Sequence, residues 1–305
     1  MEARVGRAAA AVMMLVFLAA CGGPGPTSPS RVAPGTVTVG SFDFPESEVL
    51  AEVYGQALEA KGLPVRLALN LGPRELVLPA LLRRLVHLVP EYEGSALDFL
   101  SRSLAADADP VATHTALDRV LSPTGAVALR SAPAQDANAF AVTRATARQF
   151  HLRTVSDLGP FAGRMVFGGP RECPQRPLCL PGLRSVYGLS FRRFYPLDTG
   201  GSLTIAALTS GNVDVALVFS SDPVVADRGF VLLRDDRRLE PAENVTPVVG
   251  RAMVRRYGAR LTSAIDAVSA RLTGRQLVSI NRAVAAGRSP ATVAAQWLAG
   301  QGLIP

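Results

Sequence analysis

Short apolar strands alternate with amphipathic helices in two separate stretches of this sequence of 305 residues. The first stretch, residues 36–90, reads strand, helix, strand, helix, strand. The second stretch has strands expected over 138–143, 165–168, 213–218 and 230–233. Such alternation is typical of a mostly parallel sheet covered by helices. Because the pattern starts twice, it predicts an α/β protein of two lobes, each a mostly parallel sheet flanked by helices.

The loops that follow the expected strands are the places to look for a binding site. In α/β sheets, ligands lie at the carboxyl ends of the strands, on loops that lead into helices. The loops in question are 41–46, 72–75, 91–95 and 219–222. After the second stretch the pattern changes, and three helices are expected over 260–271, 273–286 and 290–300.

The composition limits the classes of function. Hydrophobic residues make up 48% of the chain, which is enough for a packed core. The net charge is +7, but the arginines are dispersed and show no basic run with interleaved aromatic residues. The sequence contains no G-x-S-x-G, no P-loop and no cluster of metal ligands. We therefore expect no enzyme activity, no cofactor, no metal and no nucleic-acid partner.

The first 35 residues have the pattern of an export signal followed by a tether. Two arginines precede an apolar run over residues 8–20, which is too short to span a bilayer as an ordinary helix. The run ends in Leu18-Ala19-Ala20-Cys21, which resembles a bacterial lipobox, although an ordinary secretory signal with a chance cysteine is the alternative. We expect a signal peptide over residues 1–20, a lipid on Cys21 and a flexible tether over 21–35. The protein would then be exported and held on the outer face of the cell membrane by its lipid alone.

Two cysteines, Cys173 and Cys179, lie in a stretch rich in Gly, Pro and Arg. A zinc site would need about four ligands, and the three histidines show no metal spacing. A redox C-x-x-C motif would have two intervening residues, whereas this pair has five. Thiols of an exported protein are oxidised. We therefore predict a Cys173–Cys179 disulfide that fixes the shape of the loop.

Five ordered segments carry a resemblance to a known family. They are VGSFDFPESEVLAEVYGQALEAKG, LGPRELVLPALLRRLVHLVPEYEGSAL, GGPRECPQRPLCLPGLRSVYG, GNVDVALVFSSDP and LLRDDRRLEPAENVTPVV. In their order and spacing they resemble the substrate-binding lipoproteins of osmoprotectant ABC importers, the glycine betaine, carnitine and choline binders of the ProX/OpuAC type. The resemblance covers nearly all of residues 36–305.

The resemblance implies a two-lobed periplasmic-binding-protein (Venus-flytrap) fold, whose lobes close on a bound ligand. Lobe I would comprise residues 36–133 and 236–305, and lobe II residues 134–235, with two crossing segments as the hinge. A small ligand would bind in the cleft, and the closed form would dock on a membrane permease powered by a cytoplasmic ATPase. One lipid anchor and one cleft per chain suffice, so we expect a monomer.

The sequence departs from the family at its tyrosines, which surround a quaternary ammonium through cation–π attraction. His87-Leu88-Val89 stands where the family often has Asp-Leu-Tyr, and Ile205 and Gly229 fall where tyrosines are expected. Phe42 replaces the usual lysine, and Phe219 keeps an aromatic ring without a hydroxyl. Two ligand classes follow: a quaternary amine such as glycine betaine or choline, or an aromatic or polyphenolic ligand bound for import or sensing.

The candidate ligand-binding residues fall into three chemical groups. Aromatic rings could form a new wall, carboxylates including Glu46 could face a cation, and arginines could pair with a carboxylate. Structural roles stay open for several of them, such as core packing for Phe44 and His87 or helix capping for Asp222. The expected set is Phe42, Asp43, Phe44, Arg74, His87, Glu91, Tyr92, Asn138, Arg171, Arg176, Phe219 and Asp222.

Overall fold

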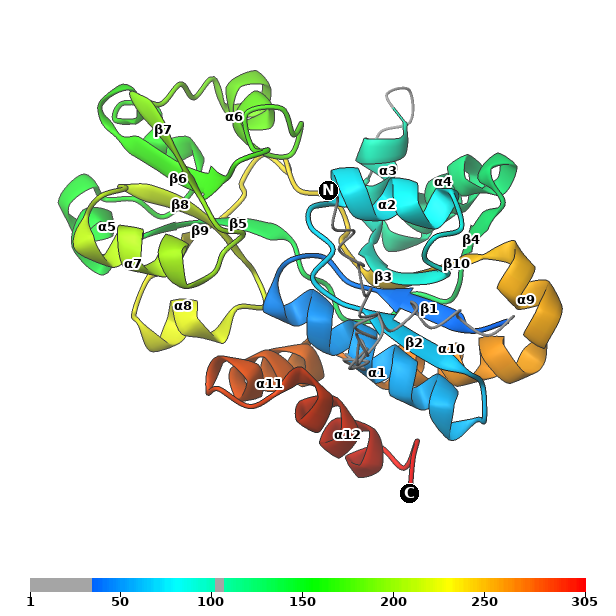
Figure 1. Cartoon of the computed structure of the whole chain (residues 1–305). Helices are drawn as coiled ribbons and strands as arrows, with labels where there is room; N and C mark the ends of the chain where they lie inside the picture. Colours follow the sequence, from blue (N-terminus) through cyan, green and yellow to red (C-terminus); the bar gives the residue numbers. More distant parts are fainter. Residues whose placement is uncertain (1–34, 102–106) are drawn as a thin grey trace, which may run out of the picture. The chain divides into compact units, whose positions relative to one another are not determined.

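A computed structural model describes residues 35–101 and 107–305, and it contains two five-stranded sheets (Figure 1). The first sheet has the order β2 (Val65–Ala68), β1 (Val37–Gly40), β3 (Leu88–Tyr92), β10 (Val245–Gly250) and β4 (Ala126–Ala128). The second has the order β7 (Arg193–Leu197), β6 (Val166–Pro170), β8 (Val215–Phe219), β5 (Asn138–Val142) and β9 (Val231–Leu233). We call the first sheet with its helices lobe I and the second with its helices lobe II. The signal peptide, Cys21 and nearly all of the tether, which were predicted from sequence, lie outside the described residues.

The predicted two-lobed α/β fold is confirmed, and each sheet is mixed. Strand β1 runs parallel to β2 and β3, and β6 runs parallel to β7 and β8. Strands β10 and β5 are antiparallel to both of their neighbours. The reason lies in the connections, because β5 and β10 are the strands that the chain enters after crossing from the other sheet. The crossing segments are residues 129–137 and 234–244.

Helices cover both faces of the lobe I sheet (Figure 1). One group comprises α1 (Pro45–Ala60), α9 (Arg251–Tyr257), α10 (Ala259–Arg271), α11 (Gly274–Ala285) and α12 (Pro290–Gly300). The other comprises α2 (Arg74–Leu82), α3 (Glu93–Leu100) and α4 (Pro110–Leu121), which leads into a short 3-10 turn (Ser122–Thr124). Tyr54 of α1 is fully buried, and its hydroxyl lies 3.0 Å from the hydroxyl of Ser269 in α10. Packing of α1 against the C-terminal helices thus joins the two ends of the described chain into one core.

Lobe II has a separate core on each face of its sheet. On one face α7 (Ser202–Ser210) packs Ile205 and Leu208 against β6 and β8. The other face carries α5 (Arg144–Phe150), α6 (Leu180–Tyr187) and two 3-10 turns (Ser156–Leu158 and Ala162–Arg164). A short helix, α8 (Pro223–Asp227), follows β8. In the described ranges, no helix is long and apolar enough to cross a membrane.

Local sequence explains where the helix that borders the site begins and ends. Pro45 occupies the first turn of α1, where its missing N–H would have no helical partner in any case. Glu46 and Glu48 follow in the same turn, where the positive end of the helix dipole favours carboxylates. Gly62 ends the segment with φ of 72°, a backbone conformation that glycine adopts without strain. The loop 41–44 is thereby held between β1 and a helix with a fixed start.

Candidate functional site

The carboxyl ends of six strands face a common cavity. In lobe I the loops after β1, β2 and β3 contribute, and in lobe II the loops after β6, β7 and β8 contribute. The cavity has a volume of about 340 Å³. Its lining residues are Phe42, Asp43, Phe44, Pro73, Arg74, Glu75, Tyr92, Ser95, Asp98, Phe99, Asp136, Asn138, Pro170, Gln175, Arg176, Pro177, Leu178, Cys179, Thr199, Leu217 and Phe219. This arrangement follows the general rule for ligand sites in α/β sheets.

Four aromatic side chains form one wall of the cavity, as the sequence suggested. Phe44 lies at the centre, with its ring centroid 5.8 Å from Phe42, 6.1 Å from Tyr92 and 5.2 Å from Phe219. Phe42 and Phe44 stack with an angle of 10° between their planes. Three of the rings come from lobe I, and Phe219 comes from the end of β8 in lobe II. The faces of such rings attract cations when water is excluded.

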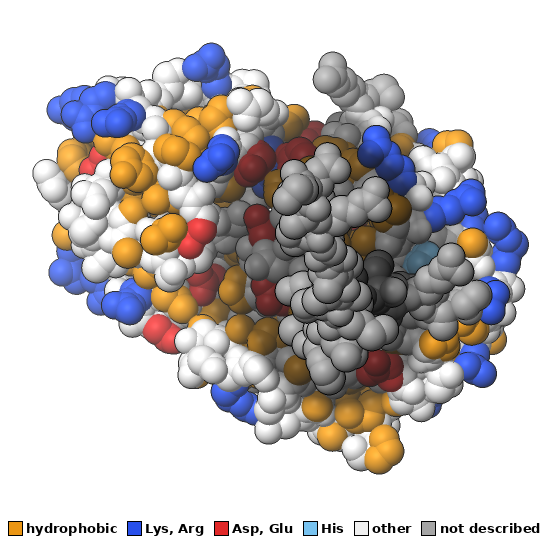
Figure 2. Space-filling model, in the orientation of Figure 1, with side chains coloured by type: hydrophobic (Ala, Val, Ile, Leu, Met, Phe, Trp, Pro, Cys, Tyr) orange, Lys and Arg blue, Asp and Glu red, His pale blue; other side chains and the backbone are white. Residues whose placement is uncertain are grey.

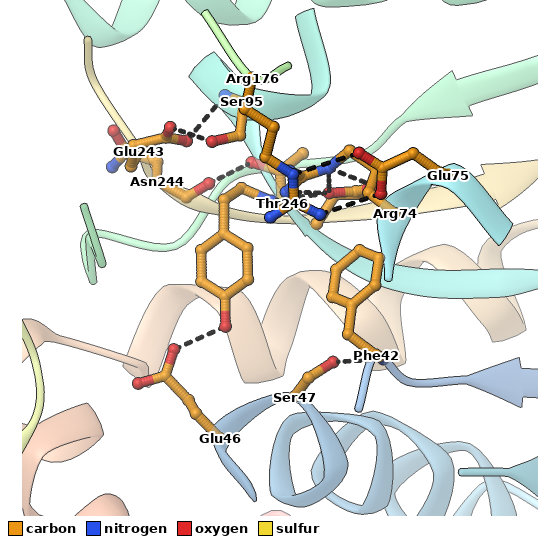
Figure 3. Close-up of polar contacts among 12 residues, drawn as sticks. Phe42, Glu46, Ser47, Arg74, Glu75, Ser95, Arg176, Glu243, Asn244 and Thr246 are labelled. Carbon is orange, nitrogen blue, oxygen red and sulfur yellow. Dashed lines mark hydrogen bonds and ion pairs between the residues drawn. The ribbon is translucent and has the colours of Figure 1, made fainter. Parts of the chain in front are cut away.

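Arg74 and Glu91 form a buried ion pair behind this wall (Figure 3). Two guanidinium nitrogens of Arg74 lie 3.1 Å from Oε2 of Glu91, and the exposed fractions of the side chains are 13% and 0%. The guanidinium also lies over the ring of Phe42, 5.2 Å from its centroid. Burial works to lower the pKa of Arg74, but the carboxylates of Glu91 and Glu243 outweigh it and hold this pKa above its usual value. Burial raises the pKa of Glu91 against the opposing effect of Arg74.

A disulfide joins Cys173 and Cys179, with their Cα atoms 5.3 Å apart, which confirms the prediction. Both cysteines are buried, and the loop that they close carries Arg176 to the edge of the cavity. Arg176 forms a bidentate pair with Glu75 at the start of α2, with distances of 3.1 and 2.9 Å (Figure 3). The disulfide loop therefore links lobe II to lobe I across the cavity.

A buried carboxylate joins the two lobes on the other side of the aromatic wall. Glu46, in the first turn of α1, accepts a hydrogen bond of 2.6 Å from the Tyr92 hydroxyl (Figure 3). It accepts a second one of 2.6 Å from the Ser221 hydroxyl of lobe II. The side-chain amide of Asn281 in α11 also donates to Glu46. Burial, together with the charge of Glu46, holds the pKa of Tyr92 well above its usual value. Glu46 thus fixes the orientation of the Tyr92 ring at the cavity.

Asp136, which the sequence did not single out, lies in the crossing segment before β5 and lines the cavity. Its Oδ1 accepts a hydrogen bond of 2.8 Å from the backbone N–H of Ser221, whereas its Oδ2 is buried with no hydrogen-bond partner among the described residues. Burial and the nearby charge of Glu46 raise the pKa of Asp136 well above its usual value. Asn138 was expected at the site. The position of Asp136 two residues before Asn138 is the one sequence signal that could have pointed to Asp136.

The remaining expected residues differ in their placement. Asn138 lines the cavity and its side-chain amide donates to the backbone carbonyl of Leu178, at 3.3 Å, and to Oε2 of Glu240, at 3.1 Å. Asp43 lines the cavity with an exposed side chain. Asp222 lies instead beside a second cavity of about 640 Å³, and its Oδ1 accepts a hydrogen bond from the backbone of Val224 in α8. Capping, the structural role left open for Asp222, is therefore the role seen.

Two expected residues lie away from the cavity. His87 precedes β3, at the amino end of the strand, while the site forms at the carboxyl ends. Its Nδ1 accepts a hydrogen bond of 3.0 Å from the backbone of Thr38, and its ring lines a different cavity of about 230 Å³. Arg171 is exposed at the turn after β6, where the backbone N–H of Cys173 bonds to the carbonyl of Pro170. Neither residue belongs to the candidate site.

The chain resembles proteins that bind osmoprotectants. The sequence model of the family described as "Substrate binding domain of ABC-type glycine betaine transport system" matches residues 35–300. The glycine betaine-binding protein YehZ of Escherichia coli is 26% identical over 277 residues, which cover 87% of this chain and 90% of that protein. The carnitine transport binding protein OpuCC of Listeria monocytogenes is 23% identical over 290 residues, which cover 93% and 91%.

Solved structures of the same kind share the two-lobed fold. A crystal structure of a glycine betaine/carnitine/choline ABC transporter protein has a TM-score of 0.69 at 24% identity, covering 88% of this chain and 99% of the other. Lactococcal OpuAC in its closed form with glycine betaine has a TM-score of 0.64 at 12% identity, covering 88% and 96%. These likenesses concern the fold, whereas the family match spans both lobes of the sequence. The chain therefore belongs to the family of substrate-binding domains of ABC-type glycine betaine transport systems.

Proposed function

We propose that this protein captures a quaternary amine of the glycine betaine or choline type outside the cytoplasm and delivers it to an ABC permease with a cytoplasmic ATPase. The family supplies the general role, which is binding of a small molecule for an ABC importer. The observation that carries the ligand class is the aromatic wall of Phe42, Phe44, Tyr92 and Phe219 at one cavity. A trimethylammonium group offers no hydrogen-bond donor, so ring faces are its natural partners.

Contacts from both lobes give the ligand a means to drive closure. A ligand shifts a conformational equilibrium only by as much as it binds one state better than the other. A ligand in contact with Phe44 of lobe I and Phe219 of lobe II gains both contacts only when the lobes are together. The proposed moving bodies are residues 36–133 with 236–305 and residues 134–235, hinged at the two crossing segments.

The N-terminal sequence supports attachment to the membrane through lipid on Cys21, after removal of residues 1–20 and with residues 21–35 as a tether. Two acyl chains are enough for stable anchoring, and one anchored monomer can present one closed cleft to the permease. Mass spectrometry of protein extracted from membranes tests this part of the proposal. An acylated N-terminal Cys21 is expected, and Cys21→Ser should release the protein; an unmodified Cys21 would contradict the anchor.

A ligand panel tests the proposed ligand class. Glycine betaine, choline, carnitine, ectoine, proline and a set of aromatic and polyphenolic compounds would be compared by thermal shift and then by calorimetry. A ligand that binds only the folded state raises the melting temperature. Saturable binding of a quaternary amine supports the proposal. Binding of an aromatic compound with no response to any quaternary amine would overturn it.

The aromatic wall itself is tested by Phe219→Leu, with Phe161→Leu as the matched control, because Phe161 packs on Phe150 in lobe II away from the cavity. Loss of one desolvated cation–π contact of about 2 kcal/mol corresponds to roughly 30-fold weaker binding. The control should bind as the unaltered protein does. Ligand recovered unchanged after incubation, together with loss of uptake in cells that lack the protein, would support transport over catalysis.

A further inference from the structure

The two arginines at the cavity are already neutralised by carboxylates of the protein. Arg74 directs two nitrogens at Glu91 and stacks on Phe42, and Arg176 uses two nitrogens on both oxygens of Glu75. Apart from Arg74 and Arg176, no residue in the cavity lining carries a positive charge among the residues that the structure describes. Each guanidinium is already balanced by a carboxylate, so a carboxylate entering the cavity would find little net positive charge to attract it unless it broke one of these pairs. Breaking the buried pair would leave Glu91 uncompensated, which costs far more than an exposed pair would.

The carboxylates at the cavity are in excess and partly unpaired. Four acidic residues stand in the lining against the two arginines: Asp43, Glu75, Asp98 and Asp136. Asp98 is half-buried, and neither its carboxylate nor that of Asp43 has a hydrogen-bond partner within residues 35–101 and 107–305. In Figure 2, acidic side chains gather along the hollow between the lobes. The charge of the cavity therefore favours a cation over a neutral or zwitterionic molecule.

Asp136 provides the specific contact. It is 3% exposed and it borders the cavity beside Phe44 and Phe219, yet its Oδ2 has no hydrogen-bond partner in the described part of the chain. An unpartnered buried carboxylate oxygen is costly, because burial removes its water without replacing it. A ligand cation held against the aromatic wall would supply the missing charge. Burial and the neighbouring charge of Glu46 raise the pKa of Asp136, and a bound cation would oppose both by favouring the ionised carboxylate.

We propose that the cavity selects a quaternary ammonium ligand that carries no carboxylate, with Asp136 as the counter-ion of its cationic group. This inference rests on the proposed function and narrows its ligand class. Among quaternary amines, a choline-like monocation is preferred over a zwitterion such as glycine betaine. The charge-balanced arginines attract a carboxylate only weakly, while the aromatic rings and Asp136 hold the ammonium group.

A trio of ligands with the same bulk tests the inference on the full chain purified in detergent. Choline carries one positive charge, glycine betaine is a zwitterion with the same trimethylammonium group, and 3,3-dimethylbutanol is an uncharged analogue of choline. Calorimetry should show that choline binds at least tenfold more tightly than either of the other two. Equal or tighter binding of glycine betaine would overturn the inference and leave the proposed function intact. Failure of both amines to bind would overturn the inference and the proposed function together.

Two substitutions separate the role of Asp136 from a general loss of charge. Asp136→Asn keeps the Oδ1 that accepts from Ser221 and removes the negative charge, so choline affinity should fall at least tenfold and the preference for choline over glycine betaine should shrink. Asp227→Asn removes a carboxylate that is 59% exposed on α8 and should leave the choline affinity unchanged. A thermal melt checks that each variant is folded. An Asp136→Asn protein that is folded and binds choline normally would show that Asp136 is not the counter-ion.

Discussion

The two walls of the cavity are held in place by different means. On the lobe I side, Arg74 and Glu91 pair with side chains only 13% and 0% exposed, and Tyr92 is fixed by Glu46. On the lobe II side, a disulfide shapes the loop, and its pair with lobe I, Arg176 and Glu75, is 27% and 38% exposed. Water weakens the second pair far more than the first. The lobe I wall is therefore held by a buried pair, whereas the Arg176–Glu75 pair that joins lobe II to it is the weaker of the two.

The comparison predicts the largest effect for Arg74→Ala. This change leaves Glu91 buried without its partner, so the free energy of unfolding should fall by about 3–5 kcal/mol. Chemical denaturation of the purified chain measures this loss. The double variant Arg74→Met/Glu91→Leu replaces the pair with apolar groups of similar size and should recover most of the stability. A loss below 1 kcal/mol in the single variant would show that the buried pair does not hold the lobe I wall.

The second effect concerns pH and Glu243, which accepts hydrogen bonds from Ser95 on the lobe I side (Figure 3). Burial raises the pKa of Glu243 from 4.5 to about 7. A raised acid pKa means that the folded state holds the proton longer, so the contribution to stability is full below pH 4.5 and is lost as pH rises to about 7. The loss is on the order of 3 kcal/mol. The free energy of unfolding would be measured at pH 5 and at pH 7.5 for the unaltered protein and for Glu243→Gln. The variant should lack the decline in stability between these two pH values.

Glu75 serves as the contrast for this pH effect. Burial works to raise the pKa of Glu75, but the hydrogen bond and charge of Arg176 outweigh it and lower the pKa below 4.5. Stability from Glu75 is therefore present above pH 4.5 and is lost as pH falls below that value. Glu75→Gln should remove a small loss of unfolding free energy at acid pH. It should leave the decline of this free energy between pH 4.5 and 7 unchanged. A pH dependence of stability that changes in the same direction in both variants would contradict the opposite pKa shifts of Glu75 and Glu243.

Removal of the disulfide should have a moderate effect that stays within lobe II. Replacing Cys173 and Cys179 together by alanine frees a short loop, which costs about 2 kcal/mol of unfolding free energy by loop entropy. Hydrogen exchange should increase in residues 170–182 and stay unchanged in α1 and β3. Increased exchange in lobe I of the same size would mean that the two walls are not independent.

The smallest stability effect is expected for Arg176→Ala, because its pair with Glu75 is partly exposed. The free energy of unfolding should change by about 0–1 kcal/mol. The informative measurement is the distance between labels on the two lobes without ligand, since loss of the pair should favour the open form. A double-mutant cycle with Glu75→Ala isolates the pair itself. An unchanged distance distribution would show that this contact does not bias closure.

Much of the fold could be predicted because its elements follow simple periodicities. Helix α1 and the three C-terminal helices α10, α11 and α12 lie within a residue or two of the ranges expected from sequence. Strand β10 was missed because it contains Pro247, and proline is rare in a central strand. The structure accommodates Pro247 by placing it opposite Pro90 of β3, while its carbonyl accepts from Leu129.

The site could be predicted where it depends on the ends of parallel strands. Phe42, Phe44 and Tyr92 follow from that rule, whereas His87 lies at the opposite end of the same strand, away from the cavity. Asp136 could not be found this way, since it lies in a crossing segment whose path depends on tertiary packing. The ion pair between Arg74 and Glu91 could not be predicted from the sequence either, because this pair joins the start of α2 to the end of β3.

The disulfide loop also has a consequence for the timing of the protein's maturation. Arg176 and Leu178 border the cavity from within the loop closed by Cys173 and Cys179. In a reducing compartment this bond does not form, so a newly made chain awaiting export would lack a complete second wall. Oxidation after export then completes the binding surface. The shape of this part of the cavity therefore depends on the redox state of the compartment in which the chain folds.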